Sequence, residues 1–412
     1  MSGEHYDTLE TRDQQAREAA LMAALPGHIA HAKANAPAYA RLLAEVDPAT
    51  VASRAALADL PVTRKSELTE MQAAEPPFGG LTGVPVSDLA RIFCSPGPIF
   101  DPEGQGGDHY RTARALYASG VRKGRIVHNC FAYHFTPAGR MFEAGAHAIG
   151  CPVFPAGTGN TEQQVQVIAA LKPAAYVGTP DYLKIILEKA DELGVELPSL
   201  TIGHVTGGAF LPPLRTFYAE RGIQVYQSYG IADLGLIAYE TTAREGLVVA
   251  EEVILEIVRP GTGDPVPDGE VGEVVITVPG HGAYPLIRFA TGDLSAVLPG
   301  TSPCGRTNTR IKGWMGRADQ TTKVKGMFVH PRQIAEVLKR HPDVLRARLV
   351  VDRPADADTM LLKIEAVPEP GLEAAVADTL AAVTKLKGRV EIEPPGSLPN
   401  DGKVIDDVRK YE

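Results

Sequence analysis

The chain has 412 residues, of which 44% are hydrophobic and 22% are charged, so it is long enough for two or three globular domains. Its formal net charge of -9 argues against nonspecific binding to nucleic acid or to an anionic membrane surface. No apolar run reaches the roughly eighteen residues of a membrane span, and the first residues, MSGEHYDTLETRDQQ, are polar and acidic. The four widely spaced cysteines, Cys94, Cys130, Cys151 and Cys304, are typical of reduced thiols, so we expect a cytoplasmic protein.

The first two thirds of the chain predict an α/β fold. Apolar residues at helical spacing over 7–46 predict opening helices, and a strand at 91–94 leads into an unusual loop, Ser95–Asp108 (SPGPIFDPEGQGGD). Strand-like runs then alternate with helical patterns, at 125–130, 151–154, 174–178, 201–205 and 223–230. Because parallel strands need crossovers of about a dozen residues or more, this alternation predicts a mainly parallel sheet.

The pattern changes after Asp233. Apolar runs such as VVAEEVILEIV and EVGEVVITV, separated by Pro-Gly and Pro-Asp-Gly turns, predict an antiparallel subdomain. Beyond residue 320, helices at 331–340 and 372–386 and strands at 344–351, 360–366 and 389–393 predict a small α+β domain. We expect a large domain over 1–317 and a small mobile domain over 318–412. The charged stretch between them, Gly316–Pro331, suits either a hinge or a plain linker.

Two motifs at predicted strand ends suit a nucleotide. In QSYGIADLG (227–235), the ring of Tyr229 beside Gly230 can lie on a planar base, and Asp233 can hold a cation. In RFATGDL (288–294), Asp293 can accept two ribose hydroxyls. The ends of parallel strands are the expected site in such a fold. Taken alone, the first motif fits a structural Tyr with a turn Gly better than a nucleotide site, and the second equally fits a hairpin turn.

Two cationic positions suit phosphate. Arg317 can neutralise a phosphate, and Lys403, in PNDGKV (399–404) on the mobile domain, can reach a developing negative charge. Taken alone, Lys403 fits a solvated surface lysine better than a catalytic one.

In this order, the motifs resemble the superfamily of adenylate-forming enzymes, which includes acyl-CoA synthetases and luciferases, and most nearly its phenylacetate–CoA ligase family. The resemblance covers most of the chain. Its other carriers are PVTRKSEL, GTGNTEQQVQVI (157–168), VGTPDYL (177–183), EIVRPGTGDPVPDGEVGEVVIT (256–277), YPLIRFATGDL, GRADQTTKVKGMFVHPRQIAEVL and the terminal GKV.

The resemblance implies a reaction in two steps. ATP activates a carboxylic acid to an acyl-adenylate, the small domain rotates, and the thiol of coenzyme A attacks the adenylate. Implied cofactors are ATP or AMP, Mg²⁺ and coenzyme A, and the implied substrate is an aryl or other compact acid such as phenylacetate. A homodimer is compatible with the resemblance. Adenylation transfers a nucleotidyl group, so it needs cations on the phosphates rather than a covalent nucleophile.

Residue roles follow from the matched motifs. The resemblance implies that Tyr229 stacks on adenine, Asp233 holds Mg²⁺, Asp293 binds ribose, Arg317 approaches ribose and phosphate, and Lys403 stabilises the adenylation transition state. It makes Asp319 the hinge residue. Further implied nucleotide, acyl or coenzyme A contacts are Gly207, Gly208, Ala209, Gly230, Arg310, Lys325 and Gly326, the last in the pantetheine tunnel. Phe131, Tyr133 and His134 follow a predicted strand where the acid pocket is expected, although they equally fit packed core.

The chain also departs from the family pattern. The family's phosphate loop is a run of Ser, Thr and Gly ending in Gly-Lys-Pro, whereas the matching place here is Ser95-Pro-Gly-Pro-Ile-Phe-Asp-Pro. Two prolines remove N–H donors, the lysine is absent, and Asp101 adds negative charge. Ala232 replaces a hydroxyl residue and Gln320 replaces a second Asp after the hinge.

Some family members hold a structural zinc through Cys and His. The corresponding positions here are Tyr239, Thr241, Val248 and Ser302, with only Cys304 retained, so we expect no zinc.

Three functions are therefore weighed. The first is an acid–thiol ligase that forms acyl-AMP and then acyl-CoA. The second, motivated by the altered phosphate loop, is a protein that binds nucleotide or acyl-adenylate without ATP turnover. The third is an adenylating enzyme that passes the acyl group to an amine or a carrier protein.

Overall fold

The computed structural model describes residues 4–96, 98–318, 320, 322–325, 327–353 and 358–409. The predicted hinge Asp319 and the predicted tunnel residue Gly326 lie outside these ranges. The chain forms two compact units. The first comprises Met1–Leu255, Ile276–Phe289 and Leu298–Gly313, and the second Glu256–Val275, Ala290–Val297 and Trp314–Glu412. The division at 317/318 stays a prediction.

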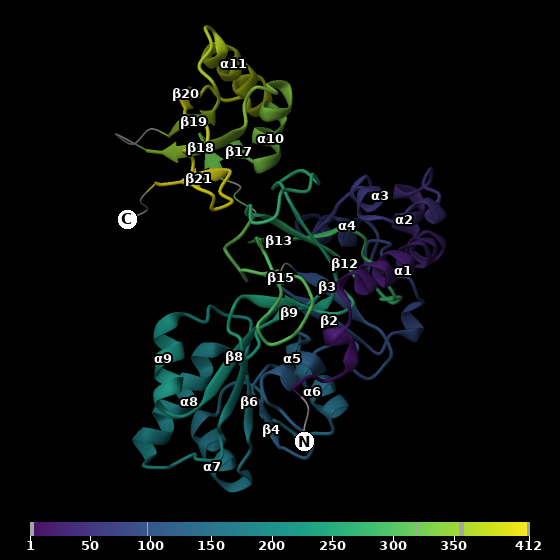
Figure 1. Ribbon diagram of the computed structural model, residues 1–412, viewed down its shortest axis with the longest axis vertical. Coiled ribbons are helices and arrows are strands. Elements are labelled where there is room, and N and C mark those ends of the chain that lie inside the picture. Colours follow the sequence, from purple (N-terminus) through teal and green to yellow (C-terminus); the bar gives the residue numbers. More distant parts are fainter. Residues whose placement is uncertain are drawn as a thin grey trace. The chain divides into compact units, whose positions relative to one another are not determined.

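Helices open the first unit, as predicted. Asp13 caps α1 by accepting a hydrogen bond from the N–H of Ala16 (2.9 Å), and the predicted apolar positions Leu21, Leu25 and Ile29 are buried. The helices are α1 (Gln14–Asn35), α2 (Pro37–Leu42), α3 (Arg54–Ala58) and α4 (Leu68–Ala74) (Figure 1). Short 3-10 helices lie at η1 (Thr8–Thr11), η2 (Pro48–Thr50), η3 (Lys65–Glu67) and η4 (Val86–Asp88), and a two-residue strand, β1, at Thr63–Arg64.

A long mixed sheet forms the centre of the first unit. Its strands there, in spatial order, are β15 (Arg310–Ile311), β10 (Leu247–Val249), β9 (Gly235–Tyr239), β8 (Gln224–Ile231), β7 (Ile202–Val205), β6 (Ala175–Gly178), β4 (Val127–Asn129) and β5 (Val153–Pro155). The run from β5 to β8 is parallel, and the pairs β8–β9, β9–β10 and β10–β15 are antiparallel. This arrangement confirms the predicted α/β class with a parallel sheet.

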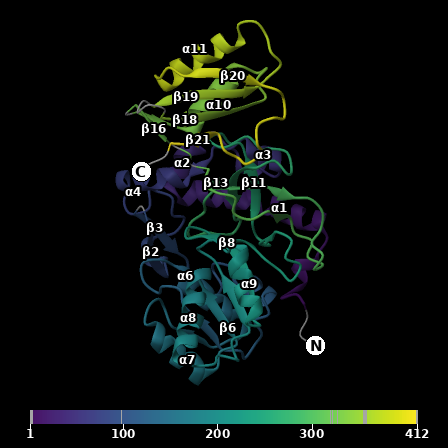
Figure 2. The same cartoon turned by 90° about the vertical axis from the view of Figure 1, so that its left-hand side faces the viewer.

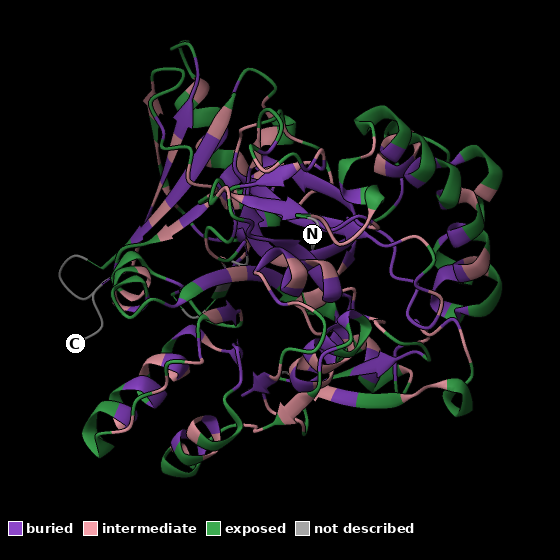
Figure 3. Cartoon of the chain, turned by 60° about the horizontal axis from the view of Figure 1, so that its bottom comes forward, coloured by how far each residue is buried: buried purple, intermediate pink, exposed green. Residues whose placement is uncertain are grey.

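Helices cover both faces of the parallel part. Tyr176 of β6 packs with α7 (Thr161–Leu171), α8 (Pro180–Leu193) and α9 (Pro212–Glu220), whereas its neighbours Ala175 and Val177 pack with α5 (Ala113–Ala118) and α6 (Ala138–Ile149) (Figure 1). Figure 3 shows the resulting pattern, with buried strands and helices that expose their outer faces. Double coverage explains why these strands appear in the sequence as short continuous apolar runs.

The predicted loop Ser95–Asp108 contains a strand that the sequence did not indicate. β2 (Arg91–Ser95) and β3 (Ile99–Glu103) form an antiparallel hairpin in which Phe93 pairs with Asp101. Gln72 of α4 fixes it from the side, because its amide bonds both the N–H (2.8 Å) and the C=O (2.9 Å) of Phe100. Prolines are rare inside strands, so the sequence did not predict this one. The backbone at its outer edge is hydrogen-bonded by a side chain instead of by another strand.

The second unit contains strands of the region predicted to be antiparallel and confirms the predicted α+β pattern. β11 (Ile254–Val258), β12 (Gly272–Thr277) and β13 (Phe289–Ser295) are neighbours in that order, followed in the chain by β14 (Val297–Leu298). The C-terminal part contains a hairpin of β16 (Thr322–Val324) and β17 (Met327–Val329), and a sheet ordered β20 (Arg389–Glu393), β19 (Thr359–Glu365), β18 (Arg346–Asp352), β21 (Ile405–Asp407). Helices α10 (Pro331–Arg340) and α11 (Leu372–Thr384) pack with this sheet around Leu349, Leu362 and Ile364 (Figure 2).

Across the described ranges, no helix is long and apolar enough to cross a membrane.

Candidate active site

The predicted adenine residue lies near the end of β8, and the predicted magnesium residue lies in the turn between β8 and β9. Tyr229 is buried and pairs with Ala238, and a bulge shifts the register between Tyr229 and Gly230. A Cβ added to Gly230 would lie 2.8 Å from the carbonyl oxygen of Gly235, so the two sides of the turn approach too closely for a side chain. The bulge thus sends the chain sharply into the turn that holds Asp233.

Asp233 is almost fully buried and has a cationic partner. The Lys65 ammonium donates to Asp233 Oδ2, while Oδ1 has no hydrogen-bond partner among the described residues. Lys65 lies in η3, so the PVTRKSEL motif supplies the counter-charge to a carboxylate 168 positions later. A carboxylate oxygen without a donor is a ligand of the type that Mg²⁺ prefers, so Asp233 fits the predicted metal role.

A second buried carboxylate, Asp101 on β3, lies beside Asp233. Burial and the negative charge of Asp233 raise the pKa of Asp101, while Ser95 and Lys65 oppose that rise. Asp101 is 1% exposed, and within the described part of the chain neither of its oxygens has a hydrogen-bond partner. The residue that the sequence marks as a departure from the family therefore faces the predicted metal ligand.

The β2–β3 hairpin offers few backbone donors for a phosphate. The N–H of Cys94 donates to the carbonyl of Phe135 (2.7 Å), that of Phe100 donates to Gln72, and Pro96 and Pro98 have none. A phosphate loop works by aiming several free N–H groups at one anion. Phosphate binding in this chain must therefore rely on charged groups more than on the described backbone of this hairpin.

The glycine loop after β7 lies next to one of the predicted acid-pocket residues. Gly207, Gly208 and Ala209 are exposed, and Gly207 has a φ of 73°. A Cβ added to Gly207 would come within 3.9 Å of the ring of Phe131. Thr206, just before the loop, donates to the carbonyl of Ser228 on β8 (2.8 Å). The loop is thus anchored to the strand that presents Tyr229.

The three predicted acid-pocket residues have different surroundings. Phe131 is 6% exposed and stacks on Phe142 with ring centroids 5.3 Å apart, so it belongs to the core as well as bordering the glycine loop. The hydroxyl of Tyr133 accepts a hydrogen bond from Asn129 (2.9 Å), and burial raises its pKa. His134 is exposed. Only Phe131 is therefore placed beside another predicted ligand residue.

In the second unit, the side chains of Trp314 and Arg317 contact the predicted ribose residue Asp293. Trp314 Nε1 (3.1 Å) and Arg317 Nη1 (2.8 Å) both donate to its Oδ1. A Cβ added to Gly292, whose φ is 75°, would lie 2.8 Å from Arg317 Nη2, so the glycine leaves space for that guanidinium. Sequence reasoning missed Trp314, although it is the single tryptophan of the chain and lies two positions before Gly316.

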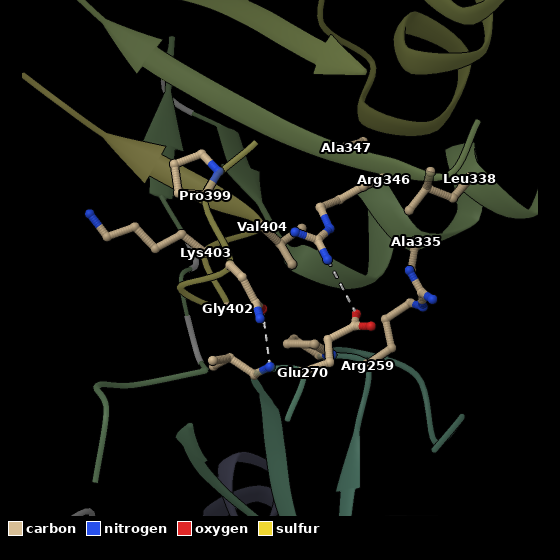
Figure 4. Close-up of a pocket in the computed structure, with 13 residues that line it drawn as sticks. Arg259, Glu270, Ala335, Leu338, Arg346, Ala347, Pro399, Gly402, Lys403 and Val404 are labelled. Atoms are coloured by element: carbon tan, nitrogen blue, oxygen red, sulfur yellow. Dashed lines mark hydrogen bonds and ion pairs between the residues drawn. The ribbon is translucent and has the colours of Figure 1, made fainter. Parts of the chain in front are cut away.

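Lys403 lies at a small pocket of the second unit, about 50 Å³ in volume, whose other lining residues include Arg259, Glu270 and Arg346 (Figure 4). Its ammonium donates to Asp406 (2.9 Å) and is half exposed, and Figure 4 shows it pointing away from Glu270.

Other predicted contacts lie apart from these groups. The buried guanidinium of Arg310 is committed to Glu245 (3.2 Å) and to the carbonyl of Pro299 (2.9 Å). Lys325 is exposed, and its backbone N–H donates to Asp358 (2.8 Å). Asp319 and Gly326, as noted, fall outside the described residues.

A buried ion pair lies where some family members hold zinc. Arg306 Nε (2.6 Å) and the hydroxyl of Tyr239 (2.8 Å) both donate to Glu10 Oε1, and Ser302 contacts Cys304 (3.1 Å). Thr241 and Val248, which also correspond to the zinc ligands of other family members, are buried. In the described part of the chain, no group of three or more His, Cys, Asp or Glu is arranged to hold a metal ion.

Comparison with known proteins identifies relatives over most of the chain. The family described as AMP-binding enzyme matches residues 109–282. A phenylacetate–coenzyme A ligase of Thermus thermophilus is 32% identical over 88% of this chain and 84% of its own length. One of Escherichia coli is 30% identical over 87% of this chain and 84% of its own.

A solved structure is similar over nearly the full length. It is 2-hydroxyisobutyryl-CoA ligase in complex with 2-HIB-AMP and CoA, with a TM-score of 0.71, 25% identity, and coverage of 99% of this chain and 93% of the other. The predicted resemblance is confirmed. The chain belongs to the phenylacetate–CoA ligase family of AMP-binding, adenylate-forming enzymes.

Proposed function

We propose that this enzyme activates a compact acid, with phenylacetate as the first candidate, and that Mg²⁺ bound through Asp233 assists the activation. Family membership makes the protein an ATP-dependent acid–CoA ligase that proceeds through an acyl-adenylate. The alternatives without turnover, or with an amine or carrier protein as acceptor, are not favoured, because the matched relatives are CoA ligases.

Two observations support a compact acid. Four matched relatives are named for phenylacetate, and the similar solved structure is named for 2-hydroxyisobutyrate, which is also a small acid. In this chain, the exposed Gly207 loop borders the ring of Phe131, and Phe131 is itself backed by Phe142. An aromatic wall of this kind favours an aryl group over a long flexible chain.

The observation that carries the nucleotide role is the fixed carboxylate of Asp293. Because Trp314 and Arg317 both donate to one of its oxygens, the carboxylate is oriented to accept hydroxyl groups. Arg317, with its side chain about half exposed, keeps donors available to a neighbouring phosphate. We propose that this pair receives the ribose.

Asp233, through Mg²⁺, and Lys403 would stabilise the negative charge of the reacting phosphates. Asp233 would hold Mg²⁺, which, when bound, supplies positive charge to the phosphates. Lys403 contributes its ammonium to the charge that develops as the acid carboxylate displaces pyrophosphate. Its side chain can turn, since its ion pair with Asp406 is partly exposed and costs little to break.

Pyrophosphate release tests the proposal. Phenylacetate, benzoate and 2-hydroxyisobutyrate are each supplied with ATP and Mg²⁺, with and without coenzyme A, to the wild type and to Lys403→Ala. We expect acid-dependent release, greatest with phenylacetate, multiple turnovers only with coenzyme A, and a loss of at least a hundredfold in the variant.

Lys339→Ala, an exposed lysine near the end of α10, is the matched control and should retain full activity. Release with 2-hydroxyisobutyrate alone would overturn the aryl-acid assignment. Release unaffected by Lys403→Ala would remove Lys403 from the adenylation step.

A further inference from the structure

The pair Asp101–Asp233 carries three buried carboxylate oxygens without donors. Both oxygens of Asp101 and Oδ1 of Asp233 have no hydrogen-bond partner among the described residues, and each residue is 1% exposed. Only Asp233 Oδ2 is satisfied, by Lys65. A buried carboxylate is normally paired, hydrogen-bonded or bound to a metal, so this arrangement points to an additional positive group.

Hydroxyl groups beside the pair are also unsatisfied. Ser95 lies next to Asp101 and is 8% exposed, yet its Oγ has no well-formed hydrogen bond within the described chain. The hydroxyl of Tyr110, 2% exposed, also has none and lies near both carboxylates. Ser95 therefore adds a third oxygen of the type found around Mg²⁺, from a different residue class.

We propose that Asp101, Asp233 and Ser95 form a divalent-cation site that binds Mg²⁺ before the nucleotide arrives. The site extends the role proposed above for Asp233 by adding a second carboxylate from the β2–β3 hairpin. One or two carboxylates with water in the remaining positions are a common way for proteins to hold Mg²⁺.

The charges of the cluster agree with this assignment. When a bound cation keeps both carboxylates ionised, they and the Lys65 ammonium sum to one negative charge, and the divalent ion converts it to one positive charge. In the family's phosphate loop, a lysine supplies one positive charge, and this chain has Asp101 in the matching stretch instead. A bound divalent cation would therefore supply the positive charge that this chain lacks, beside a hairpin with few free backbone N–H groups.

The test measures metal binding without any substrate. Mn²⁺ is titrated into the metal-free full-length protein, and free Mn²⁺ is followed by electron paramagnetic resonance in the absence of ATP. We expect one ion per chain, displaced by excess Mg²⁺. Asp101→Asn should weaken binding at least tenfold and Ser95→Ala by a smaller factor. Asp59→Asn, an exposed carboxylate at the end of α3, is the matched control and should bind as the wild type does.

Thermal unfolding provides a second readout. Mn²⁺ should raise the melting temperature of the wild type and leave that of Asp101→Asn unchanged. The neutral Asn has the shape of Asp and removes a buried charge, so the variant should fold in metal-free buffer. If Asp101→Asn does not fold, the effect of Mn²⁺ on the melting temperature is compared between the wild type and Ser95→Ala instead.

Either of two results overturns the site: no Mn²⁺ bound in the absence of ATP, or equal affinity in wild type and Asp101→Asn. Both are independent of ligase activity, because no acid, ATP or coenzyme A is present. A protein that binds Mn²⁺ through Asp101 but releases no pyrophosphate would refute the proposed reaction and leave the metal site standing.

Discussion

Gln320 Oε1 accepts a hydrogen bond from the backbone N–H of Val404 at 2.5 Å. It also accepts one from Ile405 (2.8 Å), and Gln320 Nε2 donates to the carbonyl of Gly402 (2.9 Å). One side chain thus bonds the backbone on both sides of Lys403. An Asp, the family residue at this position, accepts hydrogen bonds but cannot donate one when ionised, so the departure at Gln320 has a structural reason.

Replacing Gln320 should misplace Lys403. We expect Gln320→Ala to lower kcat for acid-dependent pyrophosphate release about tenfold, because a shift of the catalytic group of about 1 Å is costly. KM for the acid should change little, since Gln320 is a positioning residue. Gln320→Glu keeps the hydrogen-bond acceptor and loses the donor, so its kcat should lie between those of the wild type and Gln320→Ala. Gln166→Ala, an exposed glutamine on α7, is the control. A change in KM alone would contradict the positioning role.

Trp314 should report nucleotide binding. It is the single tryptophan, and its indole N–H donates to the predicted ribose carboxylate of Asp293. We expect AMP to change its fluorescence in a saturable way, with a dissociation constant that Asp293→Asn raises about tenfold or more. Titration of both proteins with AMP checks this. An AMP-dependent signal that is unaffected by Asp293→Asn would place the nucleotide elsewhere.

The Glu10–Arg306 pair should be important for stability. Its side chains are 0% and 3% exposed, and removing one partner of a buried pair leaves an uncompensated charge. We expect Glu10→Gln to lower the free energy of unfolding by about 3 kcal/mol. Glu18→Gln breaks the half-exposed pair with Arg54 and should cost less than about 1 kcal/mol. Urea unfolding compares the two, and equal losses would refute the argument.

Buried histidines should destabilise the protein in acid. Burial lowers the pKa of His28 to about 4 and that of His204 to about 3, so the native state keeps both neutral. The unfolded chain binds protons below a pKa of about 6.5, so stability falls as the pH falls from there toward the native values. The loss is about 2 kcal/mol for each group at a pH of about 5.

Variants identify the source of that acid sensitivity. His28→Gln should flatten the dependence of the urea midpoint on pH between about 7 and 5, because it removes one titrating group. His147→Gln, at an exposed position on α6, should leave the slope unchanged. The same slope in all three proteins would mean that other groups cause the acid loss.

Sequence periodicity predicted the fold well because the parallel strands are covered on both faces. Such strands appear as short apolar runs between helical patterns, and the runs at 174–178 and 201–205 correspond to β6 and β7. Motif order then predicted the family. Local turn chemistry placed Asp233 and Asp293 at strand ends; the structure has Asp233 in the turn after β8, whereas Asp293 lies within β13.

The tertiary contacts of these residues could not be predicted from the sequence. Nothing in PVTRKSEL indicates that Lys65 meets Asp233, because that contact depends on tertiary packing across 168 positions. The strand at Ile99–Glu103 was missed because its edge is satisfied by Gln72, which no periodicity records. Phe131 illustrates a third limit, since an aromatic residue after a strand can belong to a pocket, a core or both.

The bond between Glu10 and Arg306 has a consequence for biosynthesis. The two residues are 296 positions apart, so at about 5–20 residues per second a ribosome needs roughly 15–60 s to add the second after the first. During that interval the Glu10 carboxylate has no guanidinium to meet, and the first unit, which includes Leu298–Gly313, is incomplete. The first unit can therefore be completed only after the chain to Gly313 has been synthesised.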